Sequence, residues 1–294
     1  MLENNRQLNI TWFNNRKDTK GQRAKVRLDD LISMAQNPIR GQETMRQYLD
    51  LPKPQQDDKK DVGAFVGGLF HVDRRKAANL ESISFLTFDI DHAPENLPER
   101  MRALGCFFIM YPTRKSTPWE PRWRIIVPID KDIEPEKFTP LALAFAQYID
   151  PTLAIFDPVS FRAGQLMYKP SCCADSQYRV YFADKPMLSV DGLLATYADW
   201  RDTTSWPAVP GAVNPARLAA KQGDPLTKHG VVGAFCRIYD IEAAMDKFLP
   251  GVYEETITPG RFTYTGGSTT GGAVLYDGGK FLYSHHATDP CGGR

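Results

Sequence analysis

The pattern of apolar and polar positions predicts that strands alternate with helices in the centre of this chain. Apolar runs of strand length occur at residues 64–66, 83–90, 106–111 and 122–128. A helical period fills residues 97–104, and Gly105 directly after it suits the end of a helix. Strand, helix and strand in this order indicate a βαβ-like unit, so we expect an α/β fold of the α+β kind.

The segments on either side predict the organisation of the rest. Apolar residues at helical spacing make residues 1–60 a helical lead-in, and the polar, proline-containing residues 52–61 read as a loop. A central domain then covers residues 61–201 and closes with a helix at residues 190–200. The remaining parts are a proline-containing linker (202–223), a small helical module (224–250) and a glycine-rich β segment (251–294).

The helix that follows the run at residues 122–128 has two possible starts. Thr139 can cap a helix that has Pro140 at its first position. A start at Pro135 instead places Pro140 inside the helix, where a kink is expected. The sequence leaves both starts open.

Two carboxylates, Asp89 and Asp91, end the apolar run at residues 83–90. Side chains alternate between the faces of a strand, so both should project to the same side. Neighbouring carboxylates repel each other unless a cation lies between them, and hard divalent metals such as Mg²⁺ take oxygen ligands of this kind. An acidic turn in which Asp91 caps the next segment explains these residues equally well.

A cationic cluster follows the apolar run at residues 106–111. Alternation places Arg122 and Arg124 on one face of their predicted strand. Cations with hydroxyl groups are the usual phosphate-binding set. A polar hairpin with its cations in water is the alternative, but arginines inside an apolar strand need partners, which favours phosphate binding. The loop before this strand adds Thr113, Arg114, Lys115 and Ser116.

Two further charged groups are weaker candidates. Asp157 is a third carboxylate after a short apolar run, where an aspartate before a proline is usually a turn residue. It gains interest only if it lies near Asp89 and Asp91. The triplet Arg74, Arg75 and Lys76 fits a solvated turn, with phosphate contact as the lesser alternative.

Composition narrows the class of protein. The chain has 294 residues, 42% of them hydrophobic and 24% charged, with a net charge of +1, which is typical of a globular protein and excludes nucleic-acid binding through bulk charge. No apolar run is long enough to span a bilayer and the N-terminus has no signal segment, so we expect a cytoplasmic protein. Five cysteines without paired spacing fit a reducing compartment.

Four motifs in order resemble a known family. They are Leu86-Thr87-Phe88-Asp89-Ile90-Asp91-His92, Tyr111-Pro112-Thr113-Arg114-Lys115-Ser116-Thr117-Pro118, Pro121-Arg122-Trp123-Arg124-Ile125-Ile126-Val127-Pro128 and Leu166-Met167-Tyr168-Lys169-Pro170-Ser171. Together they resemble the primase-polymerase domain of the archaeo-eukaryotic primase superfamily. The nearest group lies at the N-terminus of virulence-associated or poxvirus-type primase-helicases of phages and mobile elements.

The resemblance implies a catalytic fold with an RRM-like mixed sheet and a role for each motif. It implies that Asp89, Asp91 and Asp157 bind two Mg²⁺ or Mn²⁺ ions. The segment from Thr113 to Ser116 corresponds to the motif that contacts the incoming nucleotide. Chemistry agrees, because Arg114, Lys115, Arg122 and Arg124 can neutralise charge that develops on phosphates. A template backbone could contact Arg74, Arg75 and Lys76.

This chain departs from the family pattern in three ways. The middle motif commonly holds a histidine, but residues 113–116 contain none. Gln165 stands where an arginine is usual. The helicase half is missing and no Walker motif is present, so we expect a fragment or a shortened relative whose segment 251–294 begins the region before a helicase.

The leading prediction is a metal-dependent nucleotidyltransferase that makes primers during phage or mobile-element DNA replication. Its partners would be a single-stranded DNA template, NTPs or dNTPs, and a helicase domain or subunit; no membrane is expected. One alternative is a non-catalytic single-stranded DNA-binding remnant of a primase-helicase. Another is a metal-dependent nuclease, because an acidic cluster with metal also suits hydrolysis.

Overall fold

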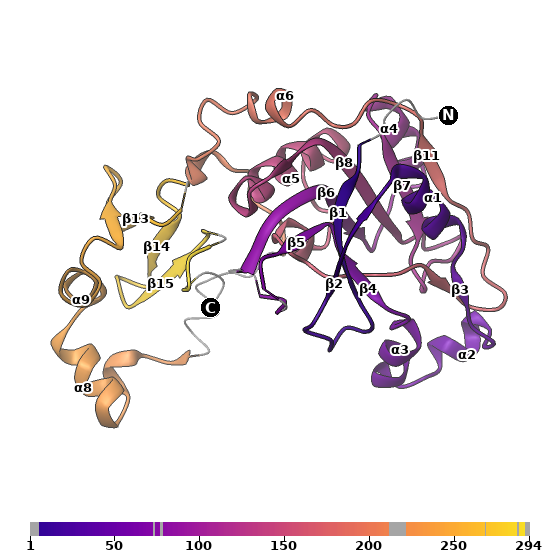
Figure 1. The fold of residues 1–294 in the computed structure, drawn as a ribbon. Helices are drawn as coiled ribbons and strands as arrows, with labels where there is room; N and C mark the ends of the chain where they lie inside the picture. The colour runs from indigo at the N-terminus through magenta and orange to yellow at the C-terminus, as the bar shows by residue number, and fades with distance from the viewer. Residues whose placement is uncertain are drawn as a thin grey trace. The chain divides into compact units, whose positions relative to one another are not determined.

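The computed structural model describes residues 6–72, 74–76, 79–211, 222–267, 269–286 and 288–291. The chain divides into two compact units, Met1–Leu194 and Ala195–Arg294. Figure 1 labels their helices and strands. None of the helices in the described ranges has the length and apolar character that crossing a membrane requires.

The first unit is built on a five-stranded sheet in the order β11-β7-β8-β6-β5, in which every neighbouring pair is antiparallel. We expected a mixed sheet, with both parallel and antiparallel pairs of strands. This expectation was wrong, because no two adjacent strands of this sheet are parallel. The strands are β5 (Gly68–Phe70), β6 (Leu80–Ile90), β7 (Phe108–Pro112), β8 (Trp123–Ile133) and β11 (Tyr181–Ala183).

The βαβ-like unit takes a split form. From β6 the chain passes through α4 (Leu97–Ala103) to β7, and β8 then returns between the two. Because β8 is antiparallel to both neighbours, β6 and β7 run parallel to each other without touching. After α5 (Pro135–Ile149) the chain comes back to the end of β6, where Phe156 forms an isolated antiparallel bridge with Ile90.

A second sheet, in the order β2-β1-β4-β9, corrects the prediction of a purely helical lead-in. Two strands, β1 (Leu8–Phe13) and β2 (Gln22–Val26), precede the first helix, α1 (Leu28–Gln36). In β1 the polar residues Asn9 and Thr11 are buried. Their burial is tolerated because they find hydrogen-bond partners: the Asn9 backbone N–H donates to Ser84, and the Thr11 hydroxyl donates to a backbone carbonyl. The sheet is completed by β4 (Ala64–Val66) and β9 (Met167–Tyr168).

Two helices directly precede β4 in the chain, and one of them replaces a predicted loop. The segment 52–61 contains α3 (Lys53–Lys60), which follows α2 (Met45–Leu49). Its prolines lie at the helix start, where a missing N–H costs nothing. Before α2 in the chain, the two-residue strand β3 (Ile39–Arg40) pairs in parallel with β10 (Ser171–Cys172).

Helix α5 settles the open question about its start. It begins at Pro135 and contains Pro140, so the alternative start at Thr139 was wrong. The extra turn buries Phe138, and the Thr139 hydroxyl donates to the Phe161 carbonyl at 3.0 Å instead of capping the helix. The predicted helix at residues 190–200 is also shorter, with α6 spanning only Val190–Leu194.

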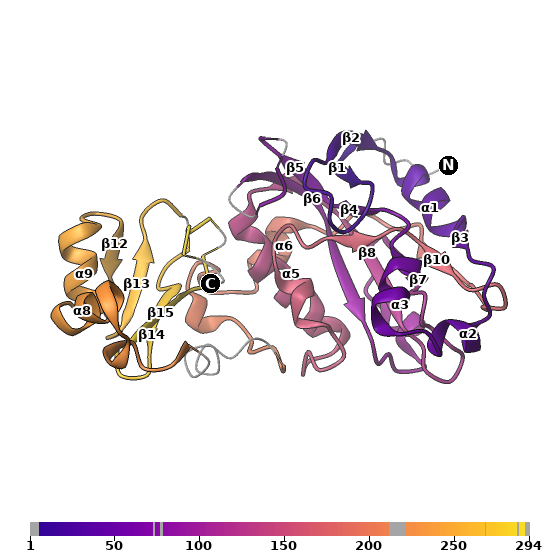
Figure 2. The same cartoon turned by 90° about the horizontal axis from the view of Figure 1, so that it is seen from below.

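Both faces of the five-stranded sheet are covered, as Figure 2 shows with β1 and β2 on one side and α5 on the other. On the α5 side, the Phe88 ring lies 5.7 Å from that of Phe145, measured between centroids. On the other side, Leu8, Phe65 and Phe85 share one buried cluster. This three-layer packing fixes the ends of β6 and β8.

Among the described residues of the second unit, the helices α8 (Gly230–Ile238) and α9 (Ile241–Phe248) lie within the range predicted to be helical. An antiparallel sheet follows in the range predicted to be β-rich. Its strands are β12 (Tyr253–Glu255), β13 (Arg261–Tyr264), β14 (Ala273–Tyr276) and β15 (Phe281–Ser284). Residues 212–221 of the predicted linker lie outside the described residues, and the five-part division remains a prediction.

Candidate functional site

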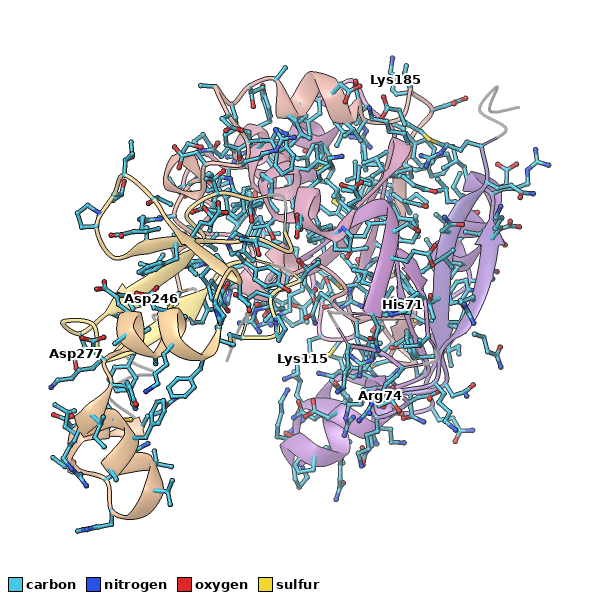
Figure 3. The ribbon with its side chains drawn as sticks, turned by 60° about the vertical axis from the view of Figure 1, so that its left-hand side comes forward. His71, Arg74, Lys115, Lys185, Asp246 and Asp277 are labelled. Atoms are coloured by element: carbon cyan, nitrogen blue, oxygen red, sulfur yellow. The ribbon has the colours of Figure 1, made fainter. Side chains whose placement is uncertain are left out.

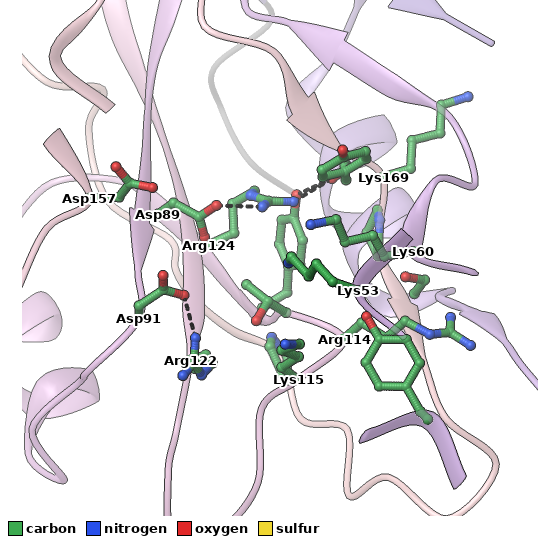
Figure 4. Close-up of a pocket in the computed structure, with 17 residues that line it drawn as sticks. Lys53, Lys60, Asp89, Asp91, Arg114, Lys115, Arg122, Arg124, Asp157 and Lys169 are labelled. Carbon is green, nitrogen blue, oxygen red and sulfur yellow. Dashed lines mark hydrogen bonds and ion pairs between the residues drawn. The ribbon is translucent and has the colours of Figure 1, made fainter. Parts of the chain in front are cut away.

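A cavity of about 220 Å³ opens in the first unit, at the ends of β6 and β8 (Figure 4). Its walls come from those strand ends, β7, the β7–β8 loop, helix α3 and the residues after β9. Eight of the twelve residues singled out in the sequence line it. They are Asp89, Asp91, Thr113, Arg114, Lys115, Arg122, Arg124 and Asp157.

The centre of the cavity is a cross-strand ion pair between Asp89 and Arg124. The strand register places these residues opposite each other, with Tyr111 opposite Arg124 on its other side. Arg124 donates from Nη2 to Asp89 Oδ2 at 2.7 Å and from Nη1 to the Tyr168 carbonyl at 2.7 Å. Burial alone would lower the pKa of Arg124, but the attraction of Asp89 and Tyr111 outweighs it and raises the pKa.

A second ion pair repeats this arrangement two residues further along. Arg122 Nη1 donates to Asp91 Oδ1 at 2.9 Å, and Nη2 donates to Glu120 Oε1 at 2.6 Å. Burial lowers the pKa of Arg122, but Glu120 and Asp91 raise it by a larger amount. The arginines thus have the partners that their place in an apolar strand requires, and these partners are the two predicted metal-binding acids.

Asp157 lies beside the first acidic residue, although it is far away in sequence. Its backbone N–H donates to the Asp89 carbonyl at 2.9 Å, next to the bridge between Phe156 and Ile90. Its carboxylate accepts a hydrogen bond from the Val159 N–H at 3.0 Å and so caps the short 3₁₀ helix Pro158–Phe161. The fold therefore brings the three predicted acids to one cavity.

The acids fit a divalent cation in chemistry, but their side chains are not gathered around one point. Within the described ranges, no three Asp, Glu, His or Cys side chains are close enough together to hold a metal ion. However, Asp89 Oδ1 is buried and has no hydrogen-bond partner among the described residues, so one acceptor is available. Hard cations such as Mg²⁺ bind carboxylate oxygens of this kind.

The residues of the β7–β8 loop differ in their contacts: some line the cavity, and Ser116 holds the loop itself in place. Ser116 is not a lining residue; its hydroxyl accepts from the Arg122 N–H at 3.0 Å and holds the loop to β8. Arg114 is buried, forms an ion pair with Glu43 and lies 5.3 Å from the centroid of the Tyr48 ring. Burial and the cations Lys53, Arg122 and Lys60 lower the pKa of Lys115.

Sequence reasoning missed two lysines of this site. Lys53 and Lys60 line the cavity from α3, a segment read as a loop. Their spacing of seven residues places them on one helix face, with Asp57 between them, and this pattern could have indicated a helix. Lys169 also lines the cavity, but its ammonium lies 4.7 Å from the centroid of the Trp12 ring and points away from the other lysines (Figure 4).

The triplet Arg74, Arg75 and Lys76 is not part of the cavity lining. It belongs to the connection between β5 and β6, and Figure 3 labels Arg74 there. Arg75 donates to the Arg16 carbonyl at 2.9 Å and lies 5.5 Å from the centroid of the Phe13 ring. Its role toward nucleic acid remains a prediction.

Comparisons with known proteins identify the family. The AEP domain of the cyanophage S-2L primase-polymerase (PrimPol), PP-N190, is similar at 10% sequence identity and a TM-score of 0.35, over 64% of this chain and 88% of that one. No curated protein matches the chain. Residues 1–209 match the model of the VapE N-terminal domain, as the resemblance to virulence-associated primase-helicases led us to expect. Since this match covers well over half of its length, the chain belongs to the VapE N-terminal domain family.

Proposed function

We propose that this domain is a primase-polymerase: a nucleotidyltransferase that extends a chain on a single-stranded DNA template with NTPs or dNTPs. The observation that carries the proposal is the meeting of three aspartates with Lys115, Arg122 and Arg124 in one cavity. The split β-α-β core, in which β8 lies between β6 and β7, also agrees with the RRM-like sheet that the family resemblance implies. In the reaction, the 3′-hydroxyl oxygen bonds to the α-phosphorus, the α–β phosphoanhydride breaks and pyrophosphate leaves.

The acids are proposed to hold Mg²⁺ or Mn²⁺. Bound ions of this type would activate the hydroxyl and stabilise the leaving pyrophosphate. Asp89 would contribute its buried, unpartnered Oδ1, while Asp91, whose side chain is half exposed, would turn from Arg122. Asp157 would join them from its position beside the Asp89 backbone.

The arginines are proposed to bind phosphate oxygens. Each guanidinium has more than one donor nitrogen, so Arg122 and Arg124 can exchange a carboxylate for a phosphate, which they bind with similar geometry. Thr113, Arg114, Lys115 and Ser116 would complete the nucleotide site by lining it or by holding the loop. Arg74, Arg75 and Lys76 would contact the template, and a helicase part is the expected partner within this family.

The direct test is primer synthesis on single-stranded DNA with NTPs or dNTPs and Mn²⁺ or Mg²⁺. The wild-type domain should make products, and the Asp89→Asn/Asp91→Asn variant should make none. Asp191→Asn is a matched control, because Asp191 is exposed and pairs only with Lys131 in the described ion pairs. Equal synthesis by the acid variant and the wild type would refute the proposal.

A non-catalytic module that binds single-stranded DNA is the second candidate. It is favoured by the two ion pairs, which already engage one carboxylate oxygen each of Asp89 and Asp91, and by the absence of a histidine at residues 113–116. This candidate predicts salt-dependent DNA binding that needs no metal, together with no incorporation of nucleotide. Nucleotide binding that depends on metal would count against it.

A further inference from the structure

Helix α3 presents two ammonium groups to the cavity that the proposed catalytic set does not use. Lys53 and Lys60 share one counterion: their Nζ atoms lie 3.1 and 2.9 Å from the same oxygen, Asp57 Oδ1. The ion pairs with Lys60 and Lys53 lower the pKa of Asp57 to about 2, so it remains a carboxylate. One negative charge thus orients two positive ones, and one positive charge remains in excess.

This helix is fixed to the wall of the cavity by buried contacts. Gln56 is buried and donates from Nε2 to the Leu51 carbonyl at 2.7 Å. The Tyr48 hydroxyl donates to the Gln56 carbonyl at 3.1 Å, and the Tyr48 ring, which is fully buried, lies against Arg114. Arg114 in turn is held by Glu43. These contacts therefore hold in place the helix that carries Lys53 and Lys60.

The aspartates of the cavity and the two lysines of α3 lie on different sides of it. The lining contains three aspartates and seven lysines or arginines, an excess of four cations. Figure 4 shows Asp89, Asp91 and Asp157 on one side of Arg124, and Lys53 and Lys60 on the other. In this arrangement, a ligand with several phosphates would have its reacting phosphate at the acids and its outermost phosphate at α3.

We propose that Lys53 and Lys60 bind the terminal phosphate of a nucleoside triphosphate and make the site selective for triphosphates over diphosphates and monophosphates. This inference rests on the proposed function, because it assumes that the acids hold the α-phosphate end. The lowered pKa of Lys115, to which Lys53 and Lys60 contribute, agrees with it. Positive side chains that lie close together repel one another, so a bound anion that neutralises them stabilises the site most strongly.

The test is the affinity of the full chain for ATP, ADP and AMP with Mg²⁺, measured by titration calorimetry. The wild type should prefer ATP to ADP, and Lys53→Gln/Lys60→Gln should lose about tenfold or more in ATP affinity, as expected for lost bonds to a charged group. Its AMP affinity should not change. Lys53→Arg/Lys60→Arg should keep the preference for ATP.

Lys59→Gln is the matched control, since Lys59 belongs to the same helix but does not line the cavity. Lys53→Gln alone, at an exposed position, keeps the test valid if the double variant fails to fold. An unchanged ATP-to-ADP ratio in a folded variant that still binds ATP would overturn this inference and leave the proposed function intact. Absence of any nucleotide binding by the wild type would overturn both.

Discussion

The two faces of the five-stranded sheet use neighbouring residues for opposite purposes. Phe88 points into an aromatic cluster with Phe145, Phe156 and Phe161, while the next residue, Asp89, lines the cavity. The same step occurs after α5, where Phe156 joins the cluster and the next residue, Asp157, lines the cavity. At this end of the sheet, the face toward α5 (the apolar face) thus fixes where the acids stand. The opposite face (the charged face) is apolar further along, at Phe85, and provides the chemistry only here.

This division predicts the largest stability effect on the apolar face. Phe88→Ala should lower the free energy of unfolding by about 3–5 kcal/mol, because Phe88 is fully buried among three aromatic rings. Chemical denaturation measures this loss. A loss below about 1 kcal/mol would show that the cluster does not anchor the strand ends.

A smaller loss is expected where the charged face is buried. Arg124→Met should destabilise the unit by about 2 kcal/mol, because it leaves the Asp89 carboxylate, which is only a quarter exposed, without its partner. Adding Asp89→Asn to this variant should restore part of the loss in the same denaturation experiment. Strictly additive effects in this double-mutant cycle would mean that the pair is not coupled.

At the more exposed ion pair the expected effect concerns binding. Arg122→Gln frees Asp91, so Mn²⁺ affinity without nucleotide should rise about two- to fivefold, as suits a partly exposed pair. Nucleotide affinity should fall in the same variant. Electron paramagnetic resonance of free Mn²⁺ measures the first change, and weaker metal binding would contradict the exchange of partners proposed for Arg122.

The smallest effect is the dependence of stability on pH at α3. The pKa of Asp57 in the folded protein, about 2, lies below its ordinary value of 3.8, so its contribution is fully present above pH 4 and is lost as the pH falls toward 2. Because the ion pairs of Asp57 with Lys53 and Lys60 are partly exposed to solvent, we expect a contribution of less than about 1 kcal/mol to the free energy of unfolding. Asp57→Asn should remove this part of the pH profile in acid denaturation; an unchanged profile would contradict it.

The sequence predicted the charged face well because strand alternation is a local property. It placed Asp89 with Asp91, and Arg122 with Arg124, before any fold was known. It could not predict that β8 would lie between β6 and β7, or that Phe156 would bridge to Ile90 and bring Asp157 close. Such pairings depend on contacts between segments distant in sequence.

Helix α3 was missed for a different reason. Its only buried residue is Gln56, so the segment has no apolar stripe to reveal a helix, and its two prolines indicated a loop. Hydrogen bonds that join Gln56 to Tyr48 and to the Leu51 carbonyl hold it in place. Strand β1 was likewise hidden, because its buried positions include Asn9 and Thr11.

The measurement that tests the account most directly is transfer of a labelled α-phosphate to a primed single strand by the Asp157→Asn variant. Asparagine can still cap the 3₁₀ helix at Pro158–Phe161, so the variant should melt like the wild type while losing only the charge. The account predicts that incorporation falls about 100-fold or more. Incorporation at the wild-type rate by the folded variant would contradict the claim that the three aspartates form one catalytic site.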